Sequence, residues 1–182
     1  MNESTTGHDI RDPAVLEAVY REHIGAIQRF VARRVEDPHD AADLVADVFV
    51  AAIESGHRYR PERGSRLGWL YGIAQNVVAG HARSRARGLR ATGRISGRAL
   101  VNEDDVERMV ERIAAEEPAR QLLARLADLP ERQRAVVELV AVDGLTLTEA
   151  AAALGIAPGT ARVRYHRARA TLTHDLPLEV TP

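Results

Sequence analysis

The sequence predicts an all-α fold of two small helical domains joined by a linker. Apolar residues recur at spacings of three and four along most of the chain, as expected for amphipathic helices. No segment alternates apolar and polar residues in the way that is typical of a half-buried strand. Glycines 88, 93 and 97 and a following acidic run separate the two helical parts. The predicted division is a polar tail (1–12), an N-terminal domain (13–87), a linker (88–116), a C-terminal domain (117–173) and a short tail (174–182).

Capping residues mark the helices of the N-terminal domain. Aspartate followed by proline occurs at 12–13 and at 37–38, and this pair is typical of an N-cap and the first residue of a helix. Gly56 is expected to end the second helix. The loop HRYRPERGS (57–65) follows, and Ser65 is expected to begin a long third helix.

A helix-turn-helix is predicted in the C-terminal domain. Thr146 and Glu149 have the spacing of a capping box, in which the hydroxyl and the carboxylate each accept a hydrogen bond from a free backbone N–H. Gly155 supplies the backbone freedom for a tight turn, and Pro158 begins a second helix. This layout presents the second helix to the major groove of DNA.

The second helix contains GTARVRYHRARATL (159–172), with four arginines, one histidine and no acid. On a helical wheel the apolar side chains form one stripe that is expected to be buried: Ala161, Tyr165, Ala168 and Leu172. The side chains predicted to contact DNA are Thr160, Arg162, Val163, Arg164, His166 and Arg167. Arginine paired with guanine gives base preference, whereas contacts with phosphates give salt-dependent affinity. An ordinary solvated basic helix is the alternative.

Composition restricts the classes of function. The chain has 182 residues, a net charge of -1 and no cysteine, which fits a reducing cytoplasm. Its apolar runs are too short to span a bilayer. We find no nucleophile with an adjacent base, no phosphate-binding loop and no metal-ligand cluster, so we expect no catalysis, no cofactor and no small-molecule substrate. A helical enzyme or metal protein that uses His57, His81 and the acids is the less favoured alternative.

Three segments together resemble bacterial RNA polymerase sigma factors of the extracytoplasmic-function (ECF) group. The first two are DAADLVADVFVAAI (40–53) and GWLYGIAQNVVAGHARSRAR (68–87), which match the N-terminal domain of that family. The third runs from LADLPERQ to the end of the basic helix (126–172) and is similar to the family's C-terminal domain. The segments occur in the family's order, with a variable linker between them.

The resemblance implies core RNA polymerase and promoter DNA as partners and a cytoplasmic location, and it allows an anti-sigma factor as a further partner. It implies that core polymerase binds Asp43, Leu44, Asp47 and Val48. It implies that the −10 element is contacted by Asn76, Trp69, Arg83, Arg85 and Arg87, and that the loop 57–65 holds an extruded base. The basic C-terminal helix would read the −35 element.

Each of these assignments has an alternative. The acids at 40, 43 and 47 could form an ordinary solvated face or, less favourably, a metal site. Trp69 could belong to the core, and Asn76 could be a simple surface amide. The whole chain could instead be a stand-alone helix-turn-helix regulator that binds operators without polymerase.

Overall fold

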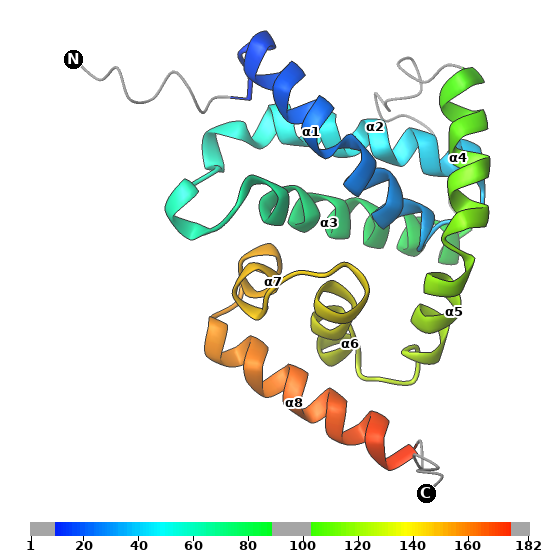
Figure 1. The fold of residues 1–182 in the computed structure, drawn as a ribbon, viewed down its shortest axis with the longest axis vertical. Coiled ribbons are helices and arrows are strands. Elements are labelled where there is room, and N and C mark those ends of the chain that lie inside the picture. The colour runs from blue at the N-terminus through cyan, green and yellow to red at the C-terminus, as the bar shows by residue number, and fades with distance from the viewer. Residues whose placement is uncertain (1–9, 89–102, 176–182) are drawn as a thin grey trace, which may run out of the picture.

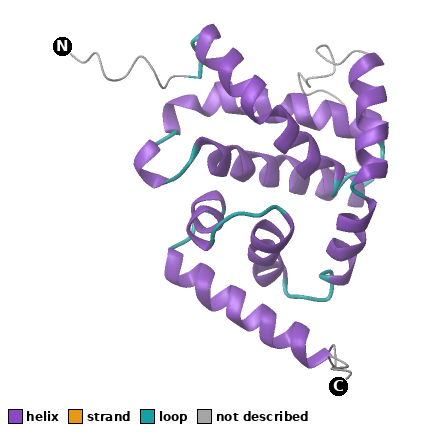
Figure 2. Cartoon of the chain, in the orientation of Figure 1, coloured by secondary structure: helices purple, strands orange, loops and turns teal. Residues whose placement is uncertain are grey.

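The computed structural model describes residues 10–88 and 103–175, and every regular element in these ranges is a helix (Figure 2). The N-terminal half contains α1 (Pro13–Ala32), α2 (Pro38–Ser55), η2 (Gly56–Arg58), η3 (Pro61–Arg63) and α3 (Arg66–Ala86). The remaining elements are α4 (Glu103–Ala115), α5 (Glu117–Arg125), α6 (Glu131–Val137), η5 (Glu138–Val142), α7 (Leu147–Ala153) and α8 (Pro158–Asp175). The all-α prediction is confirmed.

The helices of the N-terminal half begin where their capping residues predict. The carboxylates of Asp12 and Asp37 accept hydrogen bonds from the backbone N–H groups of Ala14 and Asp40. The Ser65 hydroxyl accepts one from Gly68 at the start of α3. These bonds satisfy N–H groups that have no partner inside the helix.

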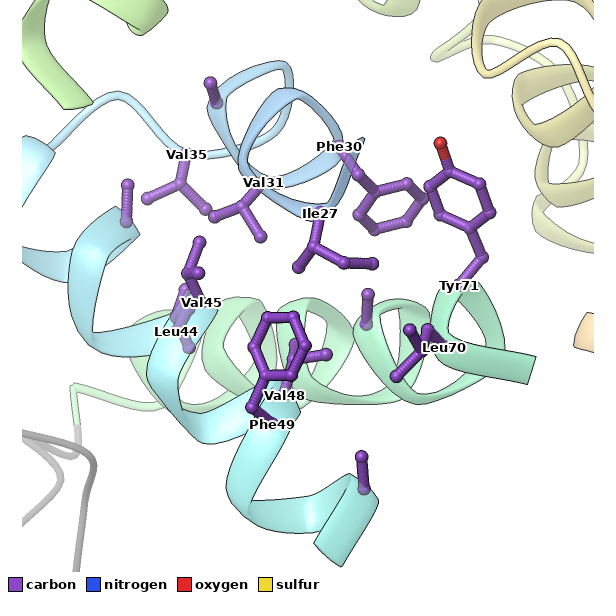
Figure 3. Close-up of a cluster of buried hydrophobic side chains, with 14 of the residues drawn as sticks. Ile27, Phe30, Val31, Val35, Leu44, Val45, Val48, Phe49, Leu70 and Tyr71 are labelled. Carbon is purple, nitrogen blue, oxygen red and sulfur yellow. The ribbon is translucent and has the colours of Figure 1, made fainter. Parts of the chain in front are cut away.

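The core of the N-terminal half lies between α1, α2 and α3 (Figure 3). Ile27 and Phe30 of α1 are fully buried and face Val48 of α2 and Leu70 of α3. The ring centroids of Phe30 and Tyr71 are 5.2 Å apart, within the range of favourable aromatic pairs. Burial of this set fixes the positions of the three helices relative to one another.

A helix, α4, occupies the second part of the segment predicted as a linker. It packs against α1 and α2 (Figure 1). Met109 and Ile113, four residues apart on one face, belong to the same buried cluster as the core of the N-terminal half. The first part of the predicted linker, residues 89–102, lies outside the described residues.

One helical segment of the C-terminal half changes its type along its length. The α-helix α6 (Glu131–Val137) continues as a π-helix from Glu138. The Asp143 N–H donates to the Glu138 carbonyl five residues earlier, which is the spacing of a π turn. Gly144 ends the element with a φ of +75°, a conformation that glycine adopts at little cost.

The two halves of the chain are in direct contact. Helix α7 packs along the N-terminal part of α3 (Figure 1), and five side chains form a part-buried charge cluster at the end of α1. This charge cluster consists of Arg33, Arg34, Glu116, Glu138 and Asp143. The Asp143 side chain is 0% exposed and pairs with both arginines.

The capping box at the start of α7 is formed as predicted. Glu149 accepts hydrogen bonds from the backbone N–H of Thr146 at 2.9 Å and from its hydroxyl at 2.8 Å. The Ser65 hydroxyl of α3 donates to the other carboxylate oxygen at 3.2 Å. The backbone hydrogen bond from Thr146, followed by the hydroxyl, lowers the pKa of Glu149.

The lowered pKa of Glu149 predicts that the free energy of unfolding depends on pH. Because the folded pKa of Glu149 is depressed, its stabilisation is present above the ordinary pKa of a glutamate and is lost as the pH falls through the folded pKa. Glu149→Gln keeps a cap that does not titrate. We expect the wild type to be more stable than Glu149→Gln at pH 7 by about 0.5 kcal/mol, the low end for capping interactions at a solvated site.

That difference should shrink toward zero between about pH 4.5 and pH 3, measured as urea unfolding of both proteins at each pH. Glu54→Gln on the exposed side of α2 is the matched control for removing one carboxylate. A difference that stays constant down to pH 3 would contradict the assignment of the cap to the ionised group.

Candidate nucleic-acid interface

The helix-turn-helix consists of α7, a turn of four residues and α8. Ala151 of α7 and Ala161 of α8 are buried in one apolar cluster, so the two helices approach closely through small side chains. Gly155 has a φ of +64° in the turn, as its sequence position predicts. This geometry holds α8 rigidly on a small hydrophobic base formed by α6 and α7.

The outer face of α8 is basic and exposed. The wheel prediction of its buried stripe is confirmed for Ala161 and Ala168, which are fully buried, while Tyr165 and Leu172 pack against neighbouring apolar clusters. The residues predicted to contact DNA are exposed, apart from the half-buried Arg164: Thr160, Arg162, Val163, His166 and Arg167. Val163, at 51% exposure, offers an apolar surface of the kind that meets a thymine methyl.

A second candidate surface lies on α3. Asn76 is exposed in the middle of the helix, and Arg83, Arg85 and Arg87 are exposed toward its C-terminal end. The Asn76 amide and the three arginine side chains therefore lie on α3 or at its C-cap. His81 and Arg85 also lie 3.5 Å and 4.0 Å from the Asp40 carboxylate of α2.

The Trp69 side chain contacts both the core of the N-terminal half and the Tyr59 ring. Its side chain is half-buried and packs against the core of the N-terminal half, and its ring centroid lies 5.3 Å from that of Tyr59. The ring therefore serves as packing on one side while its other side borders the loop 57–65. Both alternatives given for Trp69 are compatible with this position.

The structure adds two residues to this surface that the sequence reasoning did not select. Tyr59 lies in the loop 57–65, and its hydroxyl donates a 3.4 Å hydrogen bond to the Gly64 carbonyl. The Arg66 guanidinium lies 5.0 Å from the centroid of the Tyr59 ring, the geometry of a cation–π contact. An aromatic residue between arginines in a loop was the available signal, since base stacking uses such side chains.

The four residues of α2 that were predicted to bind core polymerase differ in their exposure. Leu44 and Val48, predicted to contact core polymerase, point into the core between α1 and α3 (Figure 3). In this conformation these two side chains belong to the core of the N-terminal half, and their contact with core polymerase stays a prediction. Asp43 and Asp47 are half-buried and border this face.

Among residues 10–88 and 103–175 no three histidine or acidic side chains are grouped as metal ligands. No helix in the described part of the chain is long and apolar enough to cross a membrane.

Two family models match the chain at these two surfaces. Sigma-70 region 2 matches residues 19–88 and Sigma-70, region 4 matches residues 119–172. The first match contains α2 and α3, and the second contains the helix-turn-helix.

Curated relatives and solved structures agree with the family models. The chain is 33% identical over 178 residues to ECF RNA polymerase sigma factor SigE of Mycolicibacterium smegmatis, covering 92% of this chain but only 63% of SigE. It is 34% identical over 170 residues to RNA polymerase sigma factor CarQ of Myxococcus xanthus, covering 90% of this chain and 92% of CarQ.

Among solved structures, CnrH in complex with the cytosolic domain of CnrY has a TM-score of 0.57 and 26% identity, covering 92% of this chain and 91% of that chain. The sigma factor RpoE of Bartonella quintana, solved with the anti-sigma factor NepR, has a TM-score of 0.57 at 20% identity, covers 90% of this chain and 98% of that chain, and supports the fold alone. The chain is also 32% identical to ECF RNA polymerase sigma factor SigC of Mycobacterium tuberculosis, covering 88% of this chain and 82% of SigC. It belongs to the extracytoplasmic-function group of RNA polymerase sigma factors.

Proposed function

We propose that the chain directs core RNA polymerase to specific promoters and aids promoter opening. The observation that carries this proposal is the presence of two helices with exposed arginines, α3 and α8, in two separate halves of one chain. Family membership favours this function over a stand-alone regulator. In this role the chain performs no chemistry of its own and works in the cytoplasm with the polymerase.

In this proposal α8 reads the −35 element in the major groove. Arg162 and Arg167 lie on either side of the outermost face, where guanidinium groups reach base edges and bind guanine through two hydrogen bonds. Arg164 lies beside the buried stripe, and its position suits a phosphate or an acid within the chain. The capped helix α7 crosses the DNA backbone, as in other helix-turn-helix domains.

Helix α3 contacts the −10 element. The Asn76 amide can both donate and accept hydrogen bonds at an unpaired base, and Arg83, Arg85 and Arg87 bind phosphates beside it. Tyr59 and Trp69 form an aromatic pair next to the loop, on which an extruded base can stack. Unstacked bases expose both edges and faces, so this surface suits a melted strand.

Core polymerase binds the outer side of α2. Asp43 and Asp47 supply the charge on this side, while Leu44 and Val48 hold the helix in place from inside the core. RpoE of Bartonella quintana, a sigma factor of similar fold, was solved with the anti-sigma factor NepR. We therefore include an anti-sigma factor among the partners proposed for this chain.

Footprinting with and without core polymerase tests the function directly. We expect protection of a promoter, and run-off transcription from it, only when core polymerase and the protein are both present, because each half alone makes few contacts. Core polymerase alone is the control. Tight protection of one DNA site by the protein alone would support the stand-alone regulator instead.

The two faces of α8 give a second prediction. Arg162→Ala should reduce discrimination among single-base variants of the −35 element by about 5-fold to 150-fold, the value of one two-bonded arginine–guanine pair. Arg169→Ala, at an exposed residue beside the buried stripe, should lower transcription equally on all variants or leave it unchanged. Run-off transcription over the set of promoters measures both, and equal behaviour of the two variants would contradict the assigned faces.

The polymerase surface gives a third prediction. Asp47→Arg should weaken the affinity for core polymerase by about tenfold or more, since reversing a charge at an interface replaces attraction with repulsion. Glu54→Arg, at an exposed residue near the end of the same helix, is the matched control and should bind normally. Fluorescence anisotropy of the labelled protein against core polymerase gives both constants, and equal affinities would remove Asp47 from the interface.

A further inference from the structure

The basic C-terminal end of α3 lies beside a carboxylate that belongs to another helix. No acidic residue occurs in the sequence between Glu62 and Glu103, so α3 carries none of its own. The acid is Asp40, in the first turn of α2. Its carboxylate lies 3.5 Å from Nε2 of His81 and 4.0 Å from a terminal guanidinium nitrogen of Arg85.

His81 helps to fix the position of this carboxylate. The His81 side chain is 21% exposed, and its Nε2 atom is buried and makes no hydrogen bond within the described part of the chain. A buried polar atom is costly without a polar partner, so the ring and the Asp40 carboxylate stabilise each other. The N-terminus of α2 favours a negative charge at the same place, because its free backbone N–H groups point toward it. Two interactions therefore hold Asp40 beside the basic end of α3.

The pair between Asp40 and Arg85 is looser. The Arg85 side chain is 65% exposed, and its 4.0 Å distance from the carboxylate is at the outer limit of an ion pair. An exposed pair of this kind contributes little to stability, so another anion can replace the carboxylate. A DNA phosphate bound by the same nitrogen would lie at most ~7 Å from Asp40, inside the ~8 Å screening length at physiological ionic strength. The phosphate and Asp40 would therefore repel each other.

We propose that Asp40 is an intramolecular competitor for the DNA phosphates that Arg85 binds, and that it limits the charge-driven affinity of α3 for DNA. The inference rests on the proposed function, in which the arginines at this end of α3 contact phosphates. The acids of α2 then have different roles. Asp43 and Asp47 belong to the proposed polymerase surface, whereas Asp40 acts on the helix that contacts DNA. Each phosphate that reaches Arg85 must displace this carboxylate first.

Binding of a DNA strand by the full-length protein tests the competition. A fluorescein-labelled oligothymidine strand is a suitable probe, because phosphate contacts do not depend on base sequence. Asp40→Asn should raise the affinity by about threefold or more in low salt. It should also steepen the dependence of log affinity on log salt concentration by about 0.7, the value of one additional phosphate contact on a single strand. Fluorescence anisotropy over a series of KCl concentrations measures both quantities.

A carboxylate at the other end of α2 gives the matched control. Glu54→Gln removes one exposed charge ~21 Å from Asp40 along the helix axis, and should leave the affinity and its salt dependence close to the wild-type values. If Asp40 served only the N-terminus of α2, Asp40→Asn would lower the midpoint of urea unfolding without changing the salt dependence of binding. That result, or a weaker affinity for the strand, would overturn the competition.

A double-mutant cycle assigns the effect to Arg85. Arg85→Ala alone should weaken binding of the strand, because it removes one phosphate contact. In the Arg85→Ala background, Asp40→Asn should give less than half of the gain in log affinity that it gives in the wild type, since the arginine that pairs with the carboxylate is gone. An equal gain in both backgrounds would show that Asp40 acts without Arg85, and the proposal would be wrong.

Footprinting with the holoenzyme carries the test to a promoter. When core polymerase is saturated with the protein, Asp40→Asn should reach half protection at about one third of the holoenzyme concentration that the wild type needs, the same gain as on the strand. Equal concentrations would overturn a role of Asp40 in promoter binding. Anisotropy is measured without polymerase, so its result stands apart from the proposed function, which fails only if wild type and variants all leave the promoter unprotected.

Discussion

The Asp143 carboxylate, which solvent does not reach, accepts hydrogen bonds from two consecutive arginines at the end of α1. A charge in this position is costly unless it is paired on every side. Arg34 is in turn held by the Phe30 ring, whose centroid lies 3.7 Å from the guanidinium carbon. The ring belongs to the core of the N-terminal half, so Arg34 links that core directly to the C-terminal half.

Two members of the charge cluster, Glu138 and Arg33, have raised pKa values. Two arginines face three carboxylates, and burial is the largest influence on Glu138, whose pKa is raised even though Arg34 and Arg134 lower it. Burial alone would lower the pKa of Arg33, but its pKa is raised by the hydrogen bond with Glu116 and by the charges of Glu116 and Asp143. Burial therefore makes ionisation of Glu138 less favourable than that of an exposed glutamate.

Capping residues in the sequence correctly predicted where the helices α1, α2, α3 and α7 begin. The caps at Asp12, Asp37 and Ser65 and the capping box at Thr146 involve residues two or three apart, and their hydrogen bonds are decided within one turn. The buried stripe of α8 follows from helical spacing alone. The caps agree with the structure residue by residue, whereas in the stripe Ala161 and Ala168 are buried and Tyr165 and Leu172 are half-buried.

Contacts between segments that lie far apart in the sequence could not be predicted from these local rules. Arg33 and Asp143 are 110 positions apart, and nothing in their neighbourhoods indicates a partner. Leu44 and Val48 read equally well as a docking face or as core, because periodicity shows that a face is apolar without showing what covers it. In α4, the four-residue spacing of Met109 and Ile113 was present in the sequence, but the many acids around it favoured a solvated spacer.

The contacts between the two halves combine polar and apolar groups. The buried apolar cluster of α1, α2 and α3 continues through Leu139, Leu145 and Ala150 of the C-terminal half, and separation of the halves would expose these side chains to water. The part-buried charge cluster lies beside this apolar contact, where its members would regain hydration on separation. The apolar part therefore opposes separation more strongly than the charged part does.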